Sequence, residues 1–138
     1  MNNRYLYRAK RKSDKKWIYG NLIQTDDGVY IIQNYVPQHL IGKYEVDPST
    51  ICQCTGLKDK NGKLICEHDI VRYNDMITGV EKIDRIEWNE TYASFVRLHR
   101  SKMGLQYLYI NEFIANECEV IGSAIDNPEL LEVGECLN

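Results

Sequence analysis

Hydrophobic and polar residues alternate in short runs along most of the chain, and turn-forming residues separate these runs. The first third has three such runs, at residues 5–9, 17–23 and 29–32, joined by Ser-Asp-Lys-Lys and Asp-Asp-Gly segments. Side chains of a β-strand alternate between its two faces, and Asp-Gly suits a tight turn. The pattern therefore predicts a β-meander over residues 1–36.

The middle of the chain continues with turns and short strands. Residues 35–50 contain Pro37, Gly42 and Pro48, which predicts a connecting loop with a brief strand at residues 44–46. Asn61-Gly62 tolerates the positive φ angles of tight turns, so residues 59–62 are predicted to turn the chain between two strands. Further strands are predicted at residues 69–73, 80–88, 92–98 and 118–125.

Residues 105–115 fit two patterns. Leu105, Leu108, Tyr109, Glu112 and Phe113 have helical spacing, whereas Tyr107, Tyr109 and Asn111 have strand spacing. We prefer a short helix there.

A second short helix is predicted near the C-terminus, because Asn127 is a good N-cap and Pro128 a good first helical residue. The predicted fold is mainly β, a β-meander plus a small barrel-like sheet, with one or two short helices. It forms a single domain over residues 1–138, with the meander at 1–36 and the barrel-like part at 44–132.

Composition supports a globular cytoplasmic protein. A chain of 138 residues with 43% hydrophobic residues can bury a core without help from metals or disulfides. The five cysteines are an odd number, which favours reduced thiols and a reducing compartment. No apolar run approaches the roughly 20 residues of a membrane span, so no membrane association is predicted.

Charge is distributed unevenly along the chain. Residues 1–16 carry a net charge of +6, and residues 111–138 carry a net charge of −7. A basic segment can bind nucleic acid, or the two ends can neutralise each other within a subunit or between subunits. The candidate nucleic-acid-binding residues are Arg4, Arg8, Lys10, Arg11, Lys12, Lys15 and Lys16.

Four residues within one short segment raise the question of a metal site. Cys52, Cys54, Cys66 and His68 are residue types that can bind zinc. In strands, Cys52 and Cys54 would share one face, as would Cys66 and His68, and the turn at 59–62 could bring the pairs together. However, zinc sites usually have two to four residues between paired cysteines, and buried free cysteines commonly fill space in a core. We prefer the second interpretation and predict no metal and no other cofactor.

No set of catalytic residues emerges. Glu67, His68 and Asp69 could suggest acid–base chemistry, but on a strand His68 would point away from both acids. His39 falls in a predicted loop, and His99 has no evident nucleophile beside it. We therefore predict that the protein is not an enzyme. Ten tyrosines with Trp17 and Trp88 are typical of core and interface anchors, which favours a homo-oligomer.

Several segments together resemble the YopX family of bacteriophage and prophage proteins. The most specific is Thr-Gly-Leu-Lys-Asp-Lys-Asn-Gly-Lys at residues 55–63. Other matching segments are residues 15–20, 46–50, 69–71, 86–88, 119–122 and 127–131. This family typically has Gly-Gln-Tyr-Thr-Gly at residues 52–56 and Tyr-Glu-Gly-Asp at residues 66–69. The cysteines and His68 thus replace glycine or tyrosine, and a metal site would be particular to this chain.

The resemblance implies a phage-encoded protein of the bacterial cytoplasm whose family has no established function. Glu67 and Asp69-Ile70-Val71 also resemble the entry to a strand of a small barrel, where an acid accepts backbone hydrogen bonds and the Ile-Val pair enters the core. Our leading hypothesis is a non-enzymatic, self-associating protein that binds or regulates a host or phage protein. The alternative is a nucleic-acid-binding protein that uses the basic N-terminal segment.

Overall fold

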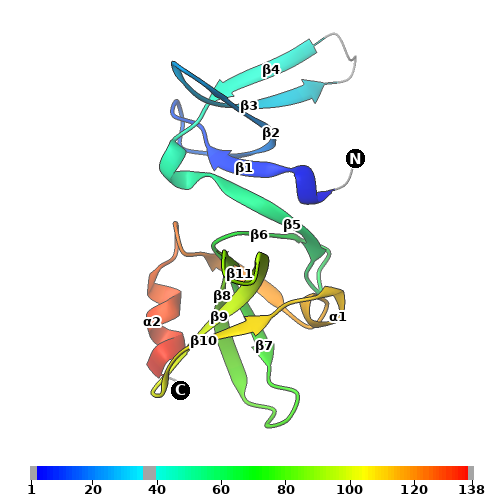
Figure 1. Cartoon of the computed structure of the whole chain (residues 1–138), viewed down its shortest axis with the longest axis vertical. Coiled ribbons are helices and arrows are strands. Elements are labelled where there is room, and N and C mark those ends of the chain that lie inside the picture. Colours follow the sequence, from blue (N-terminus) through cyan, green and yellow to red (C-terminus); the bar gives the residue numbers. More distant parts are fainter. Residues whose placement is uncertain (1–2, 36–39, 137–138) are drawn as a thin grey trace. The chain divides into compact units, whose positions relative to one another are not determined.

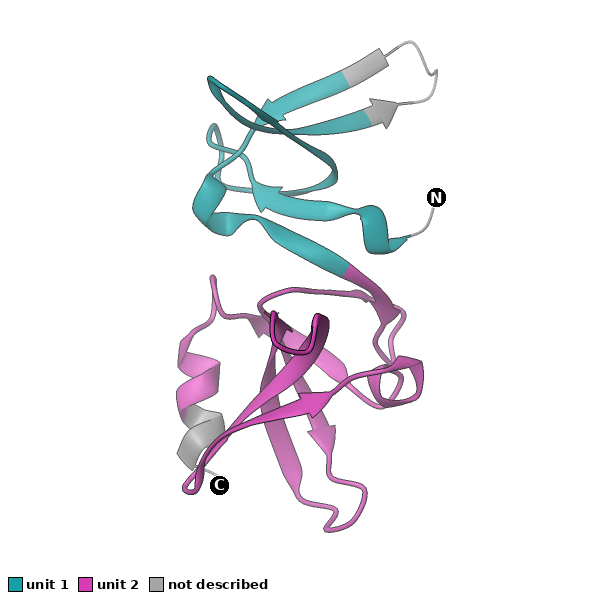
Figure 2. Cartoon of the chain, in the orientation of Figure 1, with its two compact units in different colours: residues 1–54 teal, residues 55–138 magenta. Residues whose placement is uncertain are grey.

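The structure is a computed structural model that describes residues 3–35 and 40–136. It divides into two compact units, unit 1 (residues 1–54) and unit 2 (residues 55–138) (Figure 2). The fold is mainly β with short helices, which confirms the predicted fold class. The strands are β1 (Tyr7–Lys10), β2 (Trp17–Thr25), β3 (Gly28–Tyr35), β4 (Leu40–Glu45), β5 (Cys52–Lys58), β6 (Leu64–Cys66), β7 (Asp69–Asn74), β8 (Glu81–Asn89), β9 (Ser94–Ser101), β10 (Gly104–Tyr109) and β11 (Glu119–Ser123).

Four short helices join or follow the strands. Two are 3-10 helices, η1 (Asn3–Tyr5) and η2 (Pro48–Thr50), and two are α-helices, α1 (Glu112–Ala115) and α2 (Glu129–Cys136). The cap of α1 is Asn111, whose side chain accepts a hydrogen bond from the backbone N–H of Ile114. This bond satisfies one of the donors that a helix N-terminus leaves open.

Unit 1 is an antiparallel sheet in which the strands lie in the order β4-β3-β2-β1-β5 (Figure 1). Its core contains Ala9, Ile18, Ile31 and Val46, all buried. Gly20 in β2 is required by close packing, because a Cβ atom there would lie 2.4 Å from the carbonyl oxygen of Ile32. The predicted loop at residues 35–50 is wrong in part, since β4 pairs with β3 along its length.

Unit 2 is built on a five-stranded antiparallel sheet in the order β10-β9-β8-β7-β11 (Figure 1). One face of this sheet packs into a core with Ile65, Val71, Ile86, Ala115 and Cys118. Helix α2 packs against β8 and β9. The remaining residues of β5 pair with β6 inside unit 2.

The predicted turn at residues 59–62 is confirmed. Gly62 has a φ of 80°, and its backbone N–H donates to the carbonyl oxygen of Asp59. The carboxylate of Asp59 is buried and accepts three backbone hydrogen bonds, from Asn61, Lys63 and Val120. Hydrogen bonds therefore hold the turn together and connect it to β11.

The interpretation of residues 105–115 as a helix is wrong for its first half. Residues 104–109 form strand β10, which pairs with β9 along its length, and only Glu112–Ala115 is helical. Leu105, Leu108 and Tyr109 have helical spacing, but this segment forms a strand because it pairs with β9. Such pairing commonly overrides the local sequence pattern.

Candidate functional site

Glu67, His68 and Glu87 form a group of side chains in the described part of the chain that could hold a metal ion. One ligand atom of each lies within 4.8 Å of the others. Glu67 and His68 form the turn between β6 and β7, and Glu87 lies on β8. We call this group the acid–histidine cluster.

The backbone holds His68 in a fixed but strained position. Its φ is 70°, in the left-handed region that residues other than glycine adopt at a cost. Its backbone N–H donates to the carbonyl oxygen of Ile86 at 2.7 Å, and its carbonyl oxygen accepts from Ala124 at 2.7 Å. The prediction that His68 lies on a strand and points away from Glu67 is therefore wrong. Residues 67 and 68 form a turn, where the side chains do not alternate as on a strand.

The electrostatics of the cluster favour a positive charge on His68. Nδ1 of His68 lies 3.2 Å from Oε1 of Glu87. This hydrogen bond raises the pKa of His68, while partial burial opposes the rise. The same oxygen of Glu87 is paired with the guanidinium of Arg85, which tends to lower the pKa of His68. Two carboxylates and two cationic groups thus meet at this turn.

Replacing His68 by glycine tests both the strain and the ion pair. Folding raises the pKa of this histidine above its unfolded value of about 6.5. Its contribution to the free energy of unfolding is therefore complete below about pH 6.5, and it is lost as pH rises through the folded pKa. Glycine removes a backbone strain of about 1 kcal/mol. We expect the variant to gain stability relative to the native chain as pH rises from about 6 to 9. Urea unfolding with a chelator present would measure this, and a pH-independent difference would contradict it.

The three cysteines that the sequence analysis weighed as zinc ligands are not members of this cluster. Cys52 and Cys54 are fully buried at alternate positions of β5 in unit 1, and Cys66 is fully buried at the end of β6 in unit 2. Among the described residues, the group with metal-ligand spacing contains His68 but none of these cysteines. The sequence analysis named Glu67 and His68 and missed Glu87, whose proximity depends on long-range pairing.

A second polar group lies inside unit 2. Tyr73 Oη donates to Oδ2 of Asp84 at 2.6 Å, and Nδ1 of His99 lies 2.6 Å from Oδ1 of the same carboxylate. Asp84 is 1% exposed and His99 is 2% exposed. Burial, followed by the nearby charge of Asp84, raises the pKa of Tyr73. His99 and Asp84 are thus enclosed within unit 2.

Sequence analysis identified His99 but not its partners. Tyr73, Asp84 and His99 come from three adjacent strands, β7, β8 and β9. Pairing of Val71 with Asp84, and of Arg85 with Leu98, puts them on one face. His39, the other histidine considered, lies outside the described residues.

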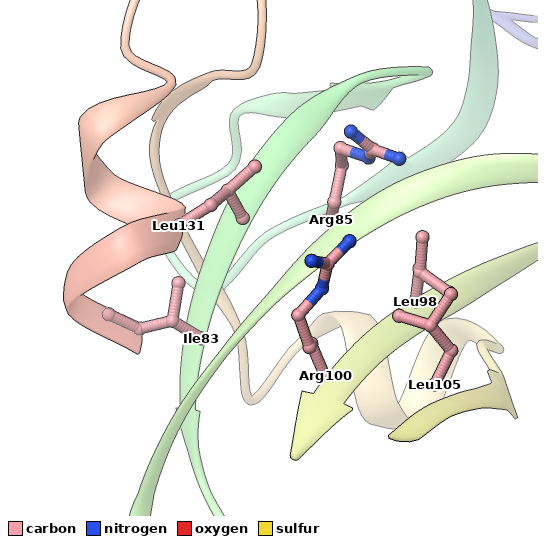
Figure 3. A pocket seen from close by; sticks show the side chains of 6 residues that line it. All are labelled: Ile83, Arg85, Leu98, Arg100, Leu105 and Leu131. Carbon is pink, nitrogen blue, oxygen red and sulfur yellow. The ribbon is translucent and has the colours of Figure 1, made fainter. Parts of the chain in front are cut away.

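Two cavities in unit 2 are small. The one beside α2 has a volume of about 40 Å³, and Figure 3 shows Leu131 of the helix and the side chains of Ile83 and Arg100 at its wall. The other has about 180 Å³ and is lined in part by Tyr73 and Arg97. Ligand pockets for drug-sized molecules usually have about 300–1,000 Å³, so neither cavity indicates such a site.

The basic N-terminal segment is largely engaged within unit 1. The guanidinium carbon of Arg8 lies 4.6 Å from the ring centre of Trp17, and Nζ of Lys10 lies 5.4 Å from it. Arg11 pairs with Asp14, and Lys12 with Glu45. Arg4 contacts the ring of its neighbour Tyr5. Lys15 and Lys16 are exposed.

Strand β10 is the last strand on one side of the unit 2 sheet, and no other strand within the described ranges pairs with its outer edge. Leu105, Tyr107 and Tyr109 are 49%, 52% and 69% exposed. Residues 103–111 contain no charged residue and no proline. Protein edge strands are usually protected by charges, prolines or covering segments, so this edge is unusually open to pairing.

These features define a two-unit, mainly β protein with an open sheet edge and an acid–histidine turn. The chain belongs to the YopX family, because the family model described as YopX protein matches residues 6–132. This confirms the resemblance seen in the sequence. No curated protein matches the chain.

A comparison with solved structures supports the fold. One matching structure is titled crystal structure of protein EF1440 from Enterococcus faecalis, is 24% identical, and aligns with a TM-score of 0.53 over 91% of this chain and 96% of that chain. Within the described residues, no helix is both long and apolar enough to cross a membrane.

Proposed function

We propose that this YopX protein is a non-enzymatic, phage- or prophage-encoded protein that self-associates through the edge of β10 and acts in the bacterial cytoplasm by binding. The observation that carries the proposal is the exposed, uncharged edge strand at residues 104–109. A binding role needs a surface rather than a catalytic group, and this edge is such a surface.

Strand pairing explains why the partner is a second copy of this chain. An antiparallel strand can pair with itself across a two-fold axis, which gives a closed dimer with one patch used twice. If the axis passes at Tyr107, the two copies of Tyr107 face each other and Leu105 faces Tyr109 of the other copy. These three residues share one face, because side chains alternate along a strand. Aromatic cross-strand pairs contribute about 0.2–1 kcal/mol each.

The surface beside this edge supports the same conclusion. Leu105 is paired with Arg100 of β9, and Tyr107 is paired with Leu98. Figure 3 shows Leu98 and Leu105 close together, with the guanidinium of Arg100 beside them. A dimer would extend the five-stranded sheet and cover the exposed leucine and tyrosines, whose burial is favourable.

The variant Tyr107→Lys tests the edge, since a lysine on an edge strand opposes pairing. We expect the native protein to be dimeric at tens of micromolar by sedimentation velocity and Tyr107→Lys to be monomeric. The matched control is Tyr92→Lys, because Tyr92 is exposed in the turn between β8 and β9. A native protein that stays monomeric, or a dimer that only Tyr92→Lys disrupts, would overturn the proposal.

Nucleic-acid binding by Arg4 to Lys16 is less supported, because Arg8, Lys10, Arg11 and Lys12 contact aromatic or acidic groups of unit 1. Binding through this segment would weaken steeply with salt. Retention of a labelled oligonucleotide by the native protein at low and high salt tests this candidate, whereas pairing of an uncharged edge should depend little on ionic strength.

A further inference from the structure

We propose that Glu67, His68 and Glu87 form a binding site for a divalent transition-metal cation, with zinc as the best fit. The site is distinct from the edge of β10, so it neither requires nor predicts self-association. It combines one imidazole nitrogen with two carboxylate oxygens, a donor set that suits zinc and leaves a position for water.

The distances match those around such an ion. Two ligands that lie about 2.0–2.2 Å from zinc at a tetrahedral angle are separated by roughly 3.3–3.5 Å. Nδ1 of His68 and Oε1 of Glu87 are already 3.2 Å apart. The Glu67 ligand atom lies within 4.8 Å of both, so it has to move closer to coordinate the same ion.

The backbone of the site is already in place. His68 donates to Ile86 and accepts from Ala124, each at 2.7 Å. These bonds connect the turn to β8, where Glu87 follows Ile86, and to the segment after β11. A ligand whose backbone is fixed on both sides loses little conformational freedom on binding, and such preorganisation favours affinity.

Metal binding would change the contacts of the Glu87 carboxylate. Without metal, Oε1 of Glu87 is paired with the guanidinium of Arg85 and lies 3.2 Å from Nδ1 of His68. On binding, Nδ1 of His68 coordinates in its unprotonated form, and the guanidinium of Arg85 leaves the oxygen of Glu87. The divalent cation thus takes the place of Arg85 beside this carboxylate.

The donor set also determines selectivity. Imidazole suits zinc, copper, iron and nickel, whereas calcium and magnesium prefer oxygen ligands alone. We therefore expect zinc to bind and magnesium and calcium not to compete at similar concentrations. The buried cysteines are poor competitors in the folded chain, and burial raises the pKa of the Cys118 thiol to about 11.

The first experiment is isothermal titration of the full chain with zinc chloride, in two buffers of different ionisation enthalpy near pH 6.5. We expect one zinc per chain and the release of up to one proton. His68→Gly should weaken binding at least tenfold, by analogy with the 10–100-fold effect of supporting residues. This variant keeps the fold, because glycine adopts the φ of 70° without strain.

Two further variants separate the cluster from its surroundings. Arg85→Gln should strengthen zinc binding, because it removes the cation that competes for Glu87. Glu67→Gln should weaken binding, while the control Glu90→Gln, an exposed acid just after β8, should leave it unchanged.

Cobalt provides a check on the ligands. Cobalt bound through this site should lack thiolate-to-metal charge-transfer absorption, because its donors are nitrogen and oxygen. Zinc binding that persists at full strength in His68→Gly, or cobalt spectra dominated by thiolate ligands, would overturn the proposal. The absence of zinc binding at micromolar to millimolar concentrations would also overturn it, whatever the oligomeric state.

Discussion

Replacing Asp84 by alanine should destabilise unit 2 by about 3–5 kcal/mol, because it leaves Tyr73 and His99 without their shared acceptor inside the core. Both oxygens of Asp84 are used, at 2.6 Å each, and the carboxylate is 1% exposed. The loss of this network should therefore exceed the effect of a typical point substitution, which is about 1 kcal/mol.

A double-mutant cycle assigns the loss to the network. Tyr73→Phe keeps the ring and removes only the hydroxyl, so it should cost about 1–2 kcal/mol. The effects of Tyr73→Phe and Asp84→Ala should not add, because both remove the same hydrogen bond. Additive effects would show that the hydroxyl of Tyr73 and the carboxylate of Asp84 act independently.

The two units require a probe that reports on unit 2 alone. Trp88 lies in unit 2, where its ring meets that of Phe95 edge-on at 5.2 Å. The other tryptophan, Trp17, lies in unit 1. Urea unfolding followed by Trp88 fluorescence in a Trp17→Phe background therefore measures the free energy of unfolding of unit 2.

Local signals in the sequence predicted local structure well. Asn61-Gly62 predicted the turn after β5 because only its own φ angles were needed. The strand at residues 80–88 was predicted from an imperfect alternation of Ile83, Ile86 and Trp88, and it corresponds to β8, in which Ile86 is buried. The family followed from the segment at residues 55–63, which lies within the matched range.

The residues of the candidate sites could not be grouped from the sequence, because strand pairing brings together residues that are far apart along the chain. Glu87 reaches His68 because the turn after β6 is hydrogen-bonded to Ile86, and Asp84 reaches His99 through pairing of β8 with β9. A strand pattern at residues 66–69 hid the turn, since periodicity does not show where one strand ends and the next begins. The resemblance did offer one clue to the turn, because the family typically has glycine at residue 68. Glycine favours the positive φ that His68 adopts.

Replacing Asp59 by asparagine should also destabilise unit 2, by about 3 kcal/mol, although the two side chains have nearly the same shape. Oδ1 of Asp59 accepts from Asn61 at 2.9 Å and from Lys63 at 2.8 Å, and Oδ2 accepts from Val120 at 2.9 Å. An asparagine amide group would place a donor against at least one of these N–H groups. A buried carboxylate that serves three donors is hard to replace, because each unsatisfied donor costs about 1–3 kcal/mol.

Asp75 is the matched control for Asp59, because it has a similar local geometry in a solvent-exposed place. Its carboxylate accepts from Ile77 and Thr78 at 2.9 Å each, and these bonds lower the pKa of Asp75. Water can satisfy the same N–H groups there, so Asp75→Asn should cost no more than about 0.5 kcal/mol. Equal losses for the two variants, measured through Trp88, would show that turn geometry rather than burial and the bond to β11 governs the stability of this motif.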